Sequence, residues 1–310
     1  MKVLVTGGAG YIGAQLVYEL SKNAAIDEII VYDNLNRNNY NLFISSSNKI
    51  PSGKVRFVMG DILDSRKLRK AMEGVDLVYH AAAKVVNPYE QQDSHIFEQV
   101  NHWGTAEVVY AAEEEESVQS LVYLSSTSVY GSSGKEKQLT EDASVNPKTF
   151  YAISKMRGEE QVRRLMEKKK AIILRCGNVY GYSPAIRFDS LINRFLFDSN
   201  FNNRVQIHGS GKQVRSYISL DKIIKTLVAI SEDKIPSGIY NLSDTNTSVL
   251  DLLDIFKEIY PSLEFIFINQ HLELKNLAID PRSKLTDHLS FEERKLKDEV
   301  IEIKEKSFAF

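Results

Sequence analysis

The sequence has almost no cysteine and no excess of charge of either sign. Cys176 is the single cysteine among 310 residues, so the chain cannot form an internal disulfide and fits a reducing compartment. Lys and Arg number 39 against 41 Asp and Glu, which gives no electrostatic reason to expect a nucleic-acid partner. We therefore expect a cytoplasmic protein that does not bind nucleic acid.

Long apolar runs are also missing. No stretch is long enough to span a bilayer, and the first six residues already form a predicted strand rather than a signal peptide. We therefore expect no membrane partner. The chain is long enough for one large α/β unit with an appended lobe.

Glycines are concentrated at the start of the chain. The apolar run 2–6 predicts a strand, residues 11–20 show helical spacing of apolar residues, and the glycines lie between the two. A strand, a glycine turn and a helix in this order predict a dinucleotide site, because glycines let the backbone approach a pyrophosphate at a helix N-terminus. The alternative is a tight turn that binds nothing.

An acidic residue follows at the position that a dinucleotide site needs. Asp33 ends the next apolar run, 28–32, at about the 20-residue spacing at which an acid holds the adenosine ribose hydroxyls. A carboxylate there also repels a 2′-phosphate, so the sequence indicates NAD rather than NADP. A polar stretch, Asn34 to Gly53, comes next; its serine-rich part at 45–48 predicts a loop beside a helix fragment.

Strands and helices then alternate. Predicted strands cover residues 55–59, 76–80, 121–124 and 171–175, and predicted helices cover 63–72, 94–115 and 151–168. This alternation predicts a Rossmann-type α/β fold with a doubly wound parallel sheet. The periodicity loosens later, with helices at 188–197, 221–230 and 248–260, strands at 205–208, 214–219, 238–242 and 264–268, and a last helix.

We divide the chain accordingly. An NAD-binding Rossmann domain covers 1–178, with 214–242 returning to it, and a smaller α/β substrate-binding lobe covers 179–213 and 243–310. Three helix starts are assigned to polar side chains: Asp221, Ser248 with Asp251, and Ser290 with Glu293.

Three side chains indicate one chemistry. Tyr151 and Lys155 are four residues apart on a predicted helix and share a face, while Ser126 follows a strand at the edge where ligands bind. A phenol has a pKa near 10, and we expect the Lys155 ammonium to lower the pKa of Tyr151. Tyr151 would then remove a proton from a sugar hydroxyl that Ser126 holds. Tyr18 and Lys22 have the same spacing but precede any serine partner, so we interpret them as a core tyrosine and a solvated lysine.

From Met1 to about Asp221, the chain resembles the extended short-chain dehydrogenase/reductase family, and within it the NAD-dependent nucleotide-sugar epimerases and dehydratases. The motifs that carry the resemblance are TGGAGYIG at 6–13, Asp33-Asn34-Leu35, Gly60-Asp61-Ile62, the alanines 81–83 with Lys84, Asn101, SSTSVYG at 125–131 and YAISK at 151–155.

The resemblance implies the roles of individual residues toward the cofactor. Gly7, Gly10 and Gly13 would border the pyrophosphate, and Asp33 the ribose. Lys84 and Lys155 would approach the nicotinamide ribose, and Asp61 with Ile62 the adenine. For Asp61 a helix cap is the open alternative. Further cofactor contacts are assigned to Tyr11, Ile12, Asn34, Ala81, Ala82, Asn101 and Tyr151.

The resemblance also implies a nucleotide-diphosphate sugar as substrate, most simply a UDP- or dTDP-hexose. Ser126 and Lys84 would face the sugar, Asn178 and Arg215 the diphosphate, and Gln206 the nucleotide base. For Arg215 the alternative is a surface charge on an edge strand. The second diphosphate arginine of typical members is absent, and Lys275 or Arg282 is the candidate replacement.

The two residues after Ser126 distinguish between the reactions known in this family. Dehydratases of this family carry Asp-Glu directly after the active-site serine, whereas here Thr127 and Ser128 follow Ser126. The sequence therefore predicts 4-epimerisation by removal and return of a hydride, with no metal. An NAD(P)-dependent reductase of a keto sugar and a non-catalytic dinucleotide-binding regulator remain alternatives. The helices at 94–115 and 151–168 form the dimer interface of similar proteins, so the resemblance implies a homodimer.

Overall fold

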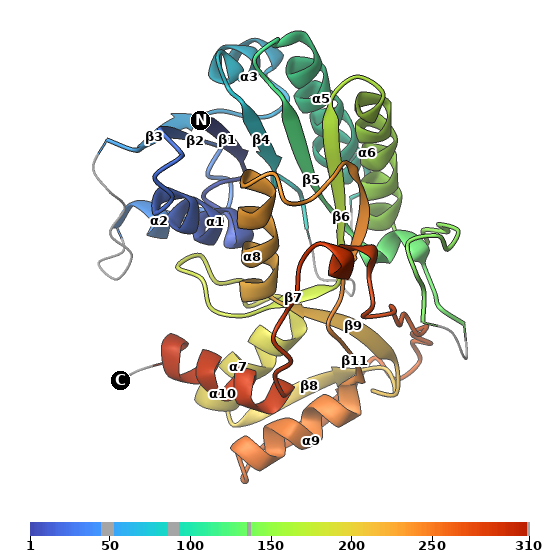
Figure 1. Ribbon diagram of the computed structural model, residues 1–310. Helices are drawn as coiled ribbons and strands as arrows, with labels where there is room; N and C mark the ends of the chain where they lie inside the picture. Colours follow the sequence, from blue (N-terminus) through green and yellow to red (C-terminus); the bar gives the residue numbers. More distant parts are fainter. Residues whose placement is uncertain (45–52, 86–92, 135–137, 309–310) are drawn as a thin grey trace.

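The computed structural model describes residues 1–44, 53–85, 93–134 and 138–308. Within these ranges a seven-stranded parallel sheet lies at the centre of the upper lobe in Figure 1, with the order β10-β6-β5-β4-β1-β2-β3. This order and the parallel pairing confirm the predicted Rossmann-type, doubly wound fold. The strands are β1 Lys2–Thr6, β2 Glu28–Asp33, β3 Val55–Met59, β4 Leu77–His80, β5 Ser120–Ser126, β6 Lys170–Cys176 and β10 Gly238–Leu242.

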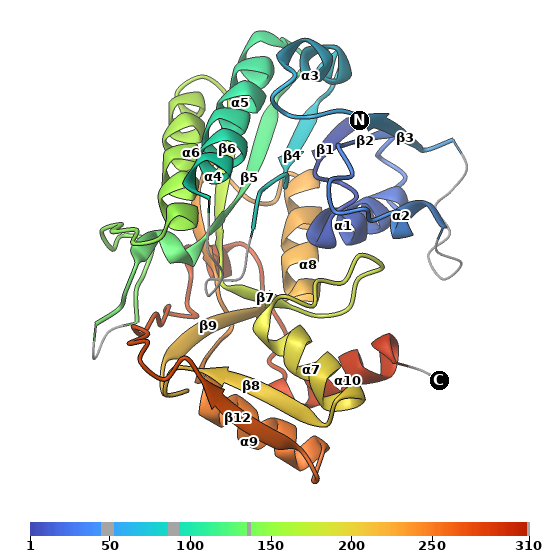
Figure 2. The same ribbon diagram turned by 180° about the vertical axis from the view of Figure 1, so that it is seen from behind.

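Helices cover both faces of the sheet, as the two opposite views show (Figures 1 and 2). On one face α1 (Tyr11–Ser21) and α8 (Leu220–Ser231) pack on Val3 and Val5, whereas Leu4 faces the opposite side. The strands are buried on both faces of the sheet, and their sequences are therefore mostly continuous apolar runs. The helices on the other face are α3 Ser65–Met72, α5 Gly104–Glu114 and α6 Phe150–Met166.

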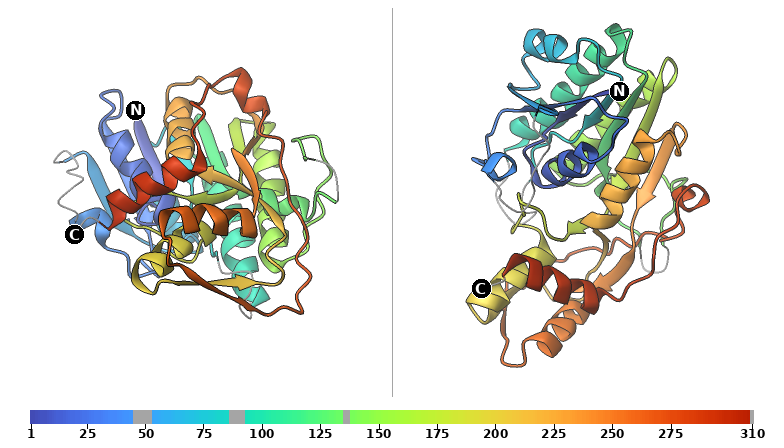
Figure 3. Two further views of the ribbon diagram at one scale, coloured as in Figure 1. Left: turned by 90° about the horizontal axis from the view of Figure 1, so that it is seen from below. Right: turned by 60° about the vertical axis from the view of Figure 1, so that its left-hand side comes forward.

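A second lobe lies beneath the carboxyl ends of the strands (Figures 1 and 3). Its core contains apolar side chains of α7 (Leu191–Phe201), β8 (Arg204–His208), α9 (Val249–Ile259) and α10 (Leu296–Ser307). β8 pairs with β12 (Glu264–Ile268), and a separate sheet has the order β11-β9-β7. Its strands are β7 Asn178–Tyr180, β9 Val214–Ser219 and β11 Thr245–Ser248. Shorter segments include α2 Asn41–Ile44 and the 3₁₀ helices η2 Thr127–Tyr130 and η3 Lys284–Asp287.

The segment 214–242, which we expected to return to the large sheet, is shared between the two sheets. β10 pairs with β6 in the large sheet, whereas β9 pairs with β7 and β11. The predicted strands 55–59, 214–219, 238–242 and 264–268 have the bounds observed, but β7 and β11 were not predicted. The serine-rich stretch 45–48 lies outside the described residues.

Two of the three predicted helix starts are wrong. Ser248 and Asp251 form the expected capping box at α9. Asp221, however, lies inside the first turn of α8, whose N-cap is Ser219. Ser290 lies more than a turn before α10, and Glu293 also precedes it. The N-cap of α10 is Lys295, which provides no side-chain hydrogen bond. Among the described residues, no helix is both long and apolar enough to cross a membrane.

Candidate active site

The glycine turn after β1 is sterically closed to other residues. Gly7 has φ +69°, and a Cβ on it would lie 2.6 Å from the Ala82 nitrogen; a Cβ on Gly13 would lie 2.2 Å from the Gly7 carbonyl oxygen. α1 begins directly after Gly10, which provides no side-chain cap, so the N–H groups of its first turn are available to an anion. The backbone N–H groups of Tyr11 and Ile12 belong to this turn. The residues therefore fit a pyrophosphate lying against bare backbone.

Asp33 is held beside that turn. Its carboxylate accepts hydrogen bonds from the backbone N–H of Ala9 at 3.0 Å and from that of Leu35 at 2.8 Å. The side chain of Asn34 donates to Asp61 at 2.9 Å, which links the ends of β2 and β3. The alternative of Asp61 as a helix cap is wrong, because Asp64 is the N-cap of α3.

Asn101 ties the end of β4 to the helix layer. Its side chain accepts from the Lys84 N–H at 2.8 Å and donates to the Lys84 carbonyl at 3.0 Å and to Ser154 on α6 at 3.0 Å. The predicted helix 94–115 is not uniformly α-helical here: α4 (Ser94–Phe97) and α5 flank a π-helical segment, η1 (Glu98–Trp103). The wider turn at η1 carries the fully buried Asn101.

Ser126, Tyr151 and Lys155 lie near the carboxyl end of β5. The Ser126 hydroxyl lies close enough to Tyr151 to lower the pKa of its phenol, and it accepts a hydrogen bond from the Ser128 N–H at 3.2 Å. Lys155 is only 3% exposed; its ammonium donates to the Leu124 carbonyl at 2.7 Å and lies 4.6 Å from the centroid of the Tyr123 ring. Lys22, by contrast, lies over Tyr18 on α1 and is half exposed, in agreement with the solvated interpretation.

Burial dominates the electrostatics of these groups. It lowers the pKa of Lys155 to about 8 and raises the pKa of Tyr151 above its usual 10. The groups that act against this rise are Arg187 and then the hydrogen bond with Ser126, whereas we expected Lys155. The Lys155 ammonium instead lies against the Leu124 carbonyl.

The comparisons with known proteins agree with this geometry. The profile of the NAD dependent epimerase/dehydratase family matches residues 3–243. The chain belongs to this family. A human dTDP-D-glucose 4,6-dehydratase is 31% identical over 83% of this chain and 74% of its own length, and a putative UDP-glucose 4-epimerase of Methanocaldococcus jannaschii is 29% identical over 82% and 81%.

A solved relative shows the same architecture over nearly the whole length. The UDP-glucuronic acid 4-epimerase of Bacillus cereus, crystallised with UDP-glucuronic acid and NAD, is 25% identical, with a TM-score of 0.86 over 98% of both chains. Membership makes this chain an enzyme of an NAD-dependent family, and the glycine turn fits that cofactor. In the part of the chain that the structure describes, no group of three or more His, Cys, Asp or Glu residues could hold a metal ion.

Arg187 lies near the candidate site, although the sequence analysis did not indicate it. It lies between β7 and α7, is paired with Asp189 at 2.5 Å, and affects the pKa values of both Tyr11 and Tyr151. Arg37 reaches the same Asp189 at 3.4 Å. Arg187 therefore lies near enough to both tyrosines for its charge to act on them. No periodic pattern marks this loop, so sequence spacing could not single it out.

The predicted substrate residues lie in two groups. Asn178 donates to the Ser216 carbonyl at 3.0 Å, and Arg215 lies on the neighbouring strand, so both belong to the three-stranded sheet. Gln206 is exposed on β8, where it lines a separate pocket of about 300 Å³ with Arg194, Asp198, Asn202 and Arg204.

The two candidates for the second diphosphate cation differ in position. The Arg215 guanidinium donates to the Lys275 carbonyl, so the main chain of Lys275 lies beside Arg215. Arg282 is paired with Asp280 at 3.1 Å, with its side chain 87% exposed.

Proposed function

We propose that this chain is an NAD-dependent 4-epimerase of nucleotide-diphosphate sugars. One observation carries the proposal: Ser126 lies close enough to Tyr151, at the end of β5, for its hydroxyl to lower the pKa of the phenol, and the two residues after Ser126 have no carboxylate. Thr127 and Ser128 carry hydroxyls in their place, and the Ser128 hydroxyl is buried without a partner among the described residues. Elimination of water needs an acid and a base that these side chains do not provide.

Each residue of the site has a separate role in the proposed reaction. NAD, when bound, would supply the acceptor and then the donor of a hydride at the sugar carbon. Ser126 accepts or donates a hydrogen bond at the same hydroxyl, and Tyr151 removes its proton and later restores it. The glycine turn and Asp33 orient the cofactor, and Lys155 supplies a positive charge beneath the base. Asn178, Arg215 and Lys275 form the proposed diphosphate subsite, and Gln206 the proposed base subsite.

The test is a product analysis on the purified protein with UDP-glucose, UDP-glucuronic acid and dTDP-glucose. We expect the 4-epimer to form with no added cofactor, and NAD to appear in solution when the protein is denatured. A 4-keto-6-deoxy product would instead identify a dehydratase, and an absolute requirement for NADPH would identify a reductase. Both outcomes contradict the proposal.

Tyr151→Phe is the matched variant for this test. It removes only the hydroxyl, so we expect kcat to fall by about 10²-fold or more while the released NAD and the thermal midpoint stay at wild-type values. Tyr18→Phe, at the other Tyr-x-x-x-Lys spacing, is the control and should leave kcat unchanged. Full activity in Tyr151→Phe would show that Tyr151 is not the base of this reaction.

A further inference from the structure

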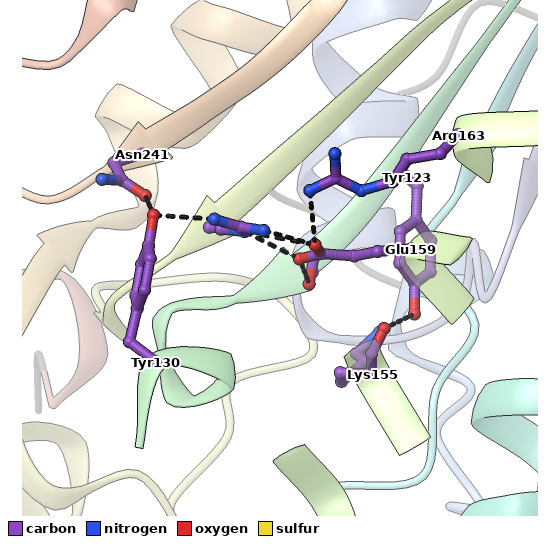
Figure 4. A network of polar contacts seen from close by, with 8 residues as sticks. Tyr123, Tyr130, Lys155, Glu159, Arg163 and Asn241 are labelled. Atoms are coloured by element: carbon purple, nitrogen blue, oxygen red, sulfur yellow. Dashed lines mark hydrogen bonds and ion pairs between the residues drawn. The ribbon is translucent and has the colours of Figure 1, made fainter. Parts of the chain in front are cut away.

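A buried ionic network around Glu159 lies close to Lys155 (Figure 4). Glu159 on α6 and Arg175 on β6 are 2% and 1% exposed and are joined by three hydrogen bonds of 2.7 to 3.2 Å. The Arg175 guanidinium also donates to the Tyr130 hydroxyl at 2.8 Å, which in turn donates to Asn241 on β10 at 2.9 Å. The network thus crosses from α6 over the sheet.

The network contacts the neighbours of each catalytic side chain. Ser125, adjacent to Ser126, donates to Glu159 at 2.6 Å, and Ser125 is in register with Arg175 on the next strand. On α6, Glu159 is one turn beyond Lys155, which is one turn beyond Tyr151. Residues four apart share a helix face. The carboxylate that fixes Ser125 therefore also fixes the face of α6 that carries Tyr151 and Lys155.

A buried ion pair such as Glu159–Arg175 contributes little to the free energy of unfolding. Removing two charges from water offsets most of their attraction, and apolar replacement of a buried pair is often neutral or stabilising. The bidentate geometry does, however, fix orientation, since a guanidinium and a carboxylate fit in one plane. The pair is therefore better explained by positioning than by stability.

We propose that Glu159 and Arg175 are positioning residues of the active site, which hold Ser126 through Ser125 and hold the Tyr151–Lys155 face of α6 against β5. The inference rests on the proposed function for its kinetic consequences. Neither side chain is expected to touch the sugar, because both are enclosed between α6 and the sheet.

Glu159 also acts on Lys155 through its charge. The carboxylate raises the pKa of Lys155 against the effect of burial, and so does Cys176. The groups that face Lys155 are Glu159 and Tyr151 on its own helix, Cys176 on β6, Tyr123 on β5 and His80 on β4. Removal of the negative charge should therefore lower the pKa of Lys155 below about 8 and move the alkaline limb of the kcat profile to lower pH.

The test replaces the whole pair, because a single change would leave one buried charge without a partner. We expect Glu159→Met/Arg175→Met to fold with a thermal midpoint near that of the wild type. We expect kcat to fall about 10- to 100-fold, as a small misplacement of catalytic groups predicts, with KM and released NAD unchanged. Wild-type kcat together with a wild-type pH profile in this variant would overturn the proposal.

A second pair of variants covers the case in which the double variant does not fold. Ser125→Ala removes only the hydrogen bond to Glu159 and should lower kcat, whereas Ser125→Thr keeps a hydroxyl and should restore it. Equal kcat in both variants would contradict the proposal. The matched control is Lys222→Met/Asp244→Asn, which removes an ion pair of 2.6 Å between α8 and the segment after β10 and should leave kcat unchanged.

One readout does not depend on turnover. NMR of protein with ¹³C-labelled lysine reports the pKa of Lys155 directly, and Lys155→Met assigns the signal. A lower pKa in Glu159→Met/Arg175→Met supports the electrostatic part of the proposal even if the wild type epimerises none of the sugars tested. If the wild type epimerises a sugar and the pKa of Lys155 is the same in the double variant as in the wild type, this inference is overturned and the proposed function stands.

Discussion

At the scale of single residues, His80 is a buried base whose protonation state is set by its neighbours. Its Nδ1 lies 2.7 Å from the Thr6 hydroxyl, and its Nε2 lies 2.8 Å from that of Thr105. The Thr105 hydroxyl donates its proton to the Asn101 carbonyl, so it must accept from Nε2–H, and Thr6 donates to Nδ1. Burial lowers the pKa of His80 from 6.5 to about 3.

The low pKa predicts acid sensitivity. Below pH 6.5 the unfolded chain binds a proton on His80 that the folded chain does not bind until about pH 3, so stability falls as the pH is lowered through this range. His80→Gln has no group that titrates there and should show a smaller loss of the free energy of unfolding between pH 6.5 and 4. Urea titrations at several pH values measure this. Parallel losses in both proteins would contradict the assignment.

Arg187 gives a second prediction at this scale. Because its charge lowers the pKa of Tyr151, removing the charge should raise that pKa. A proposed base must be deprotonated to act, so the acid limb of the kcat/KM profile should move to higher pH in Arg187→Met. Arg187→Lys keeps the charge and should move the limb less. An acid limb that stays in place in Arg187→Met would show that this cation does not act on the base.

The sequence identified most of the candidate site because its residues follow strands or share a helix face. Asp33, Ser126 and the pair Tyr151–Lys155 were placed by such spacing, and the structure brings the last three together. Arg187 lies in a loop whose conformation depends on contacts with Asp189 and the rest of the fold. A pattern read along the chain contains no information on such contacts.

At the scale of elements, strand positions were predicted better than helix ends and short strands. β3, β10 and β12 consist largely of apolar residues, and such runs indicate a strand. β11 is Thr-Asn-Thr-Ser, which has no apolar alternation and is a strand only because β9 lies beside it. The π-helical turn at η1 likewise accompanies the hydrogen bonds of Asn101 with Lys84 and Ser154, and these tertiary contacts cannot be read from helix propensity.

The start of α10 offers a prediction at this scale. Its N-cap is the exposed Lys295, which provides no side-chain acceptor, while Asp298 occupies the third position of the helix. Lys295→Ser should create the same capping arrangement that Ser248 and Asp251 form at α9, with a gain of about 1 kcal/mol in the free energy of unfolding. Denaturant unfolding measures this gain.

The control for α10 is the pair that we first assigned as its cap. Ser290→Ala should leave stability unchanged, because Ser290 lies more than one turn before the helix. A loss of about 1 kcal/mol in Ser290→Ala, together with no gain in Lys295→Ser, would restore the original assignment.

At the scale of the whole molecule, the outer side of the helix layer α5–α6 carries exposed aromatic residues. Trp103 and Tyr110 are 53% and 44% exposed, and they lie seven residues apart along η1 and α5. The Arg164 guanidinium of α6 lies 4.7 Å from the centroid of the Tyr110 ring, so this contact joins the exposed surfaces of α5 and α6. Exposed aromatic clusters of this kind are typical of protein interfaces.

We therefore predict a homodimer in which α5 and α6 of one chain pack on the same helices of a second. Light scattering should give the mass of two chains for the wild type and of one chain for Trp103→Glu/Tyr110→Glu, because buried unpaired carboxylates are costly at an interface. Phe265→Glu, on the exposed face of β12, removes an aromatic residue of similar exposure and should leave the dimer intact. Since α6 also carries Tyr151, a monomeric variant that keeps full kcat would show that each chain's active site is complete without its partner.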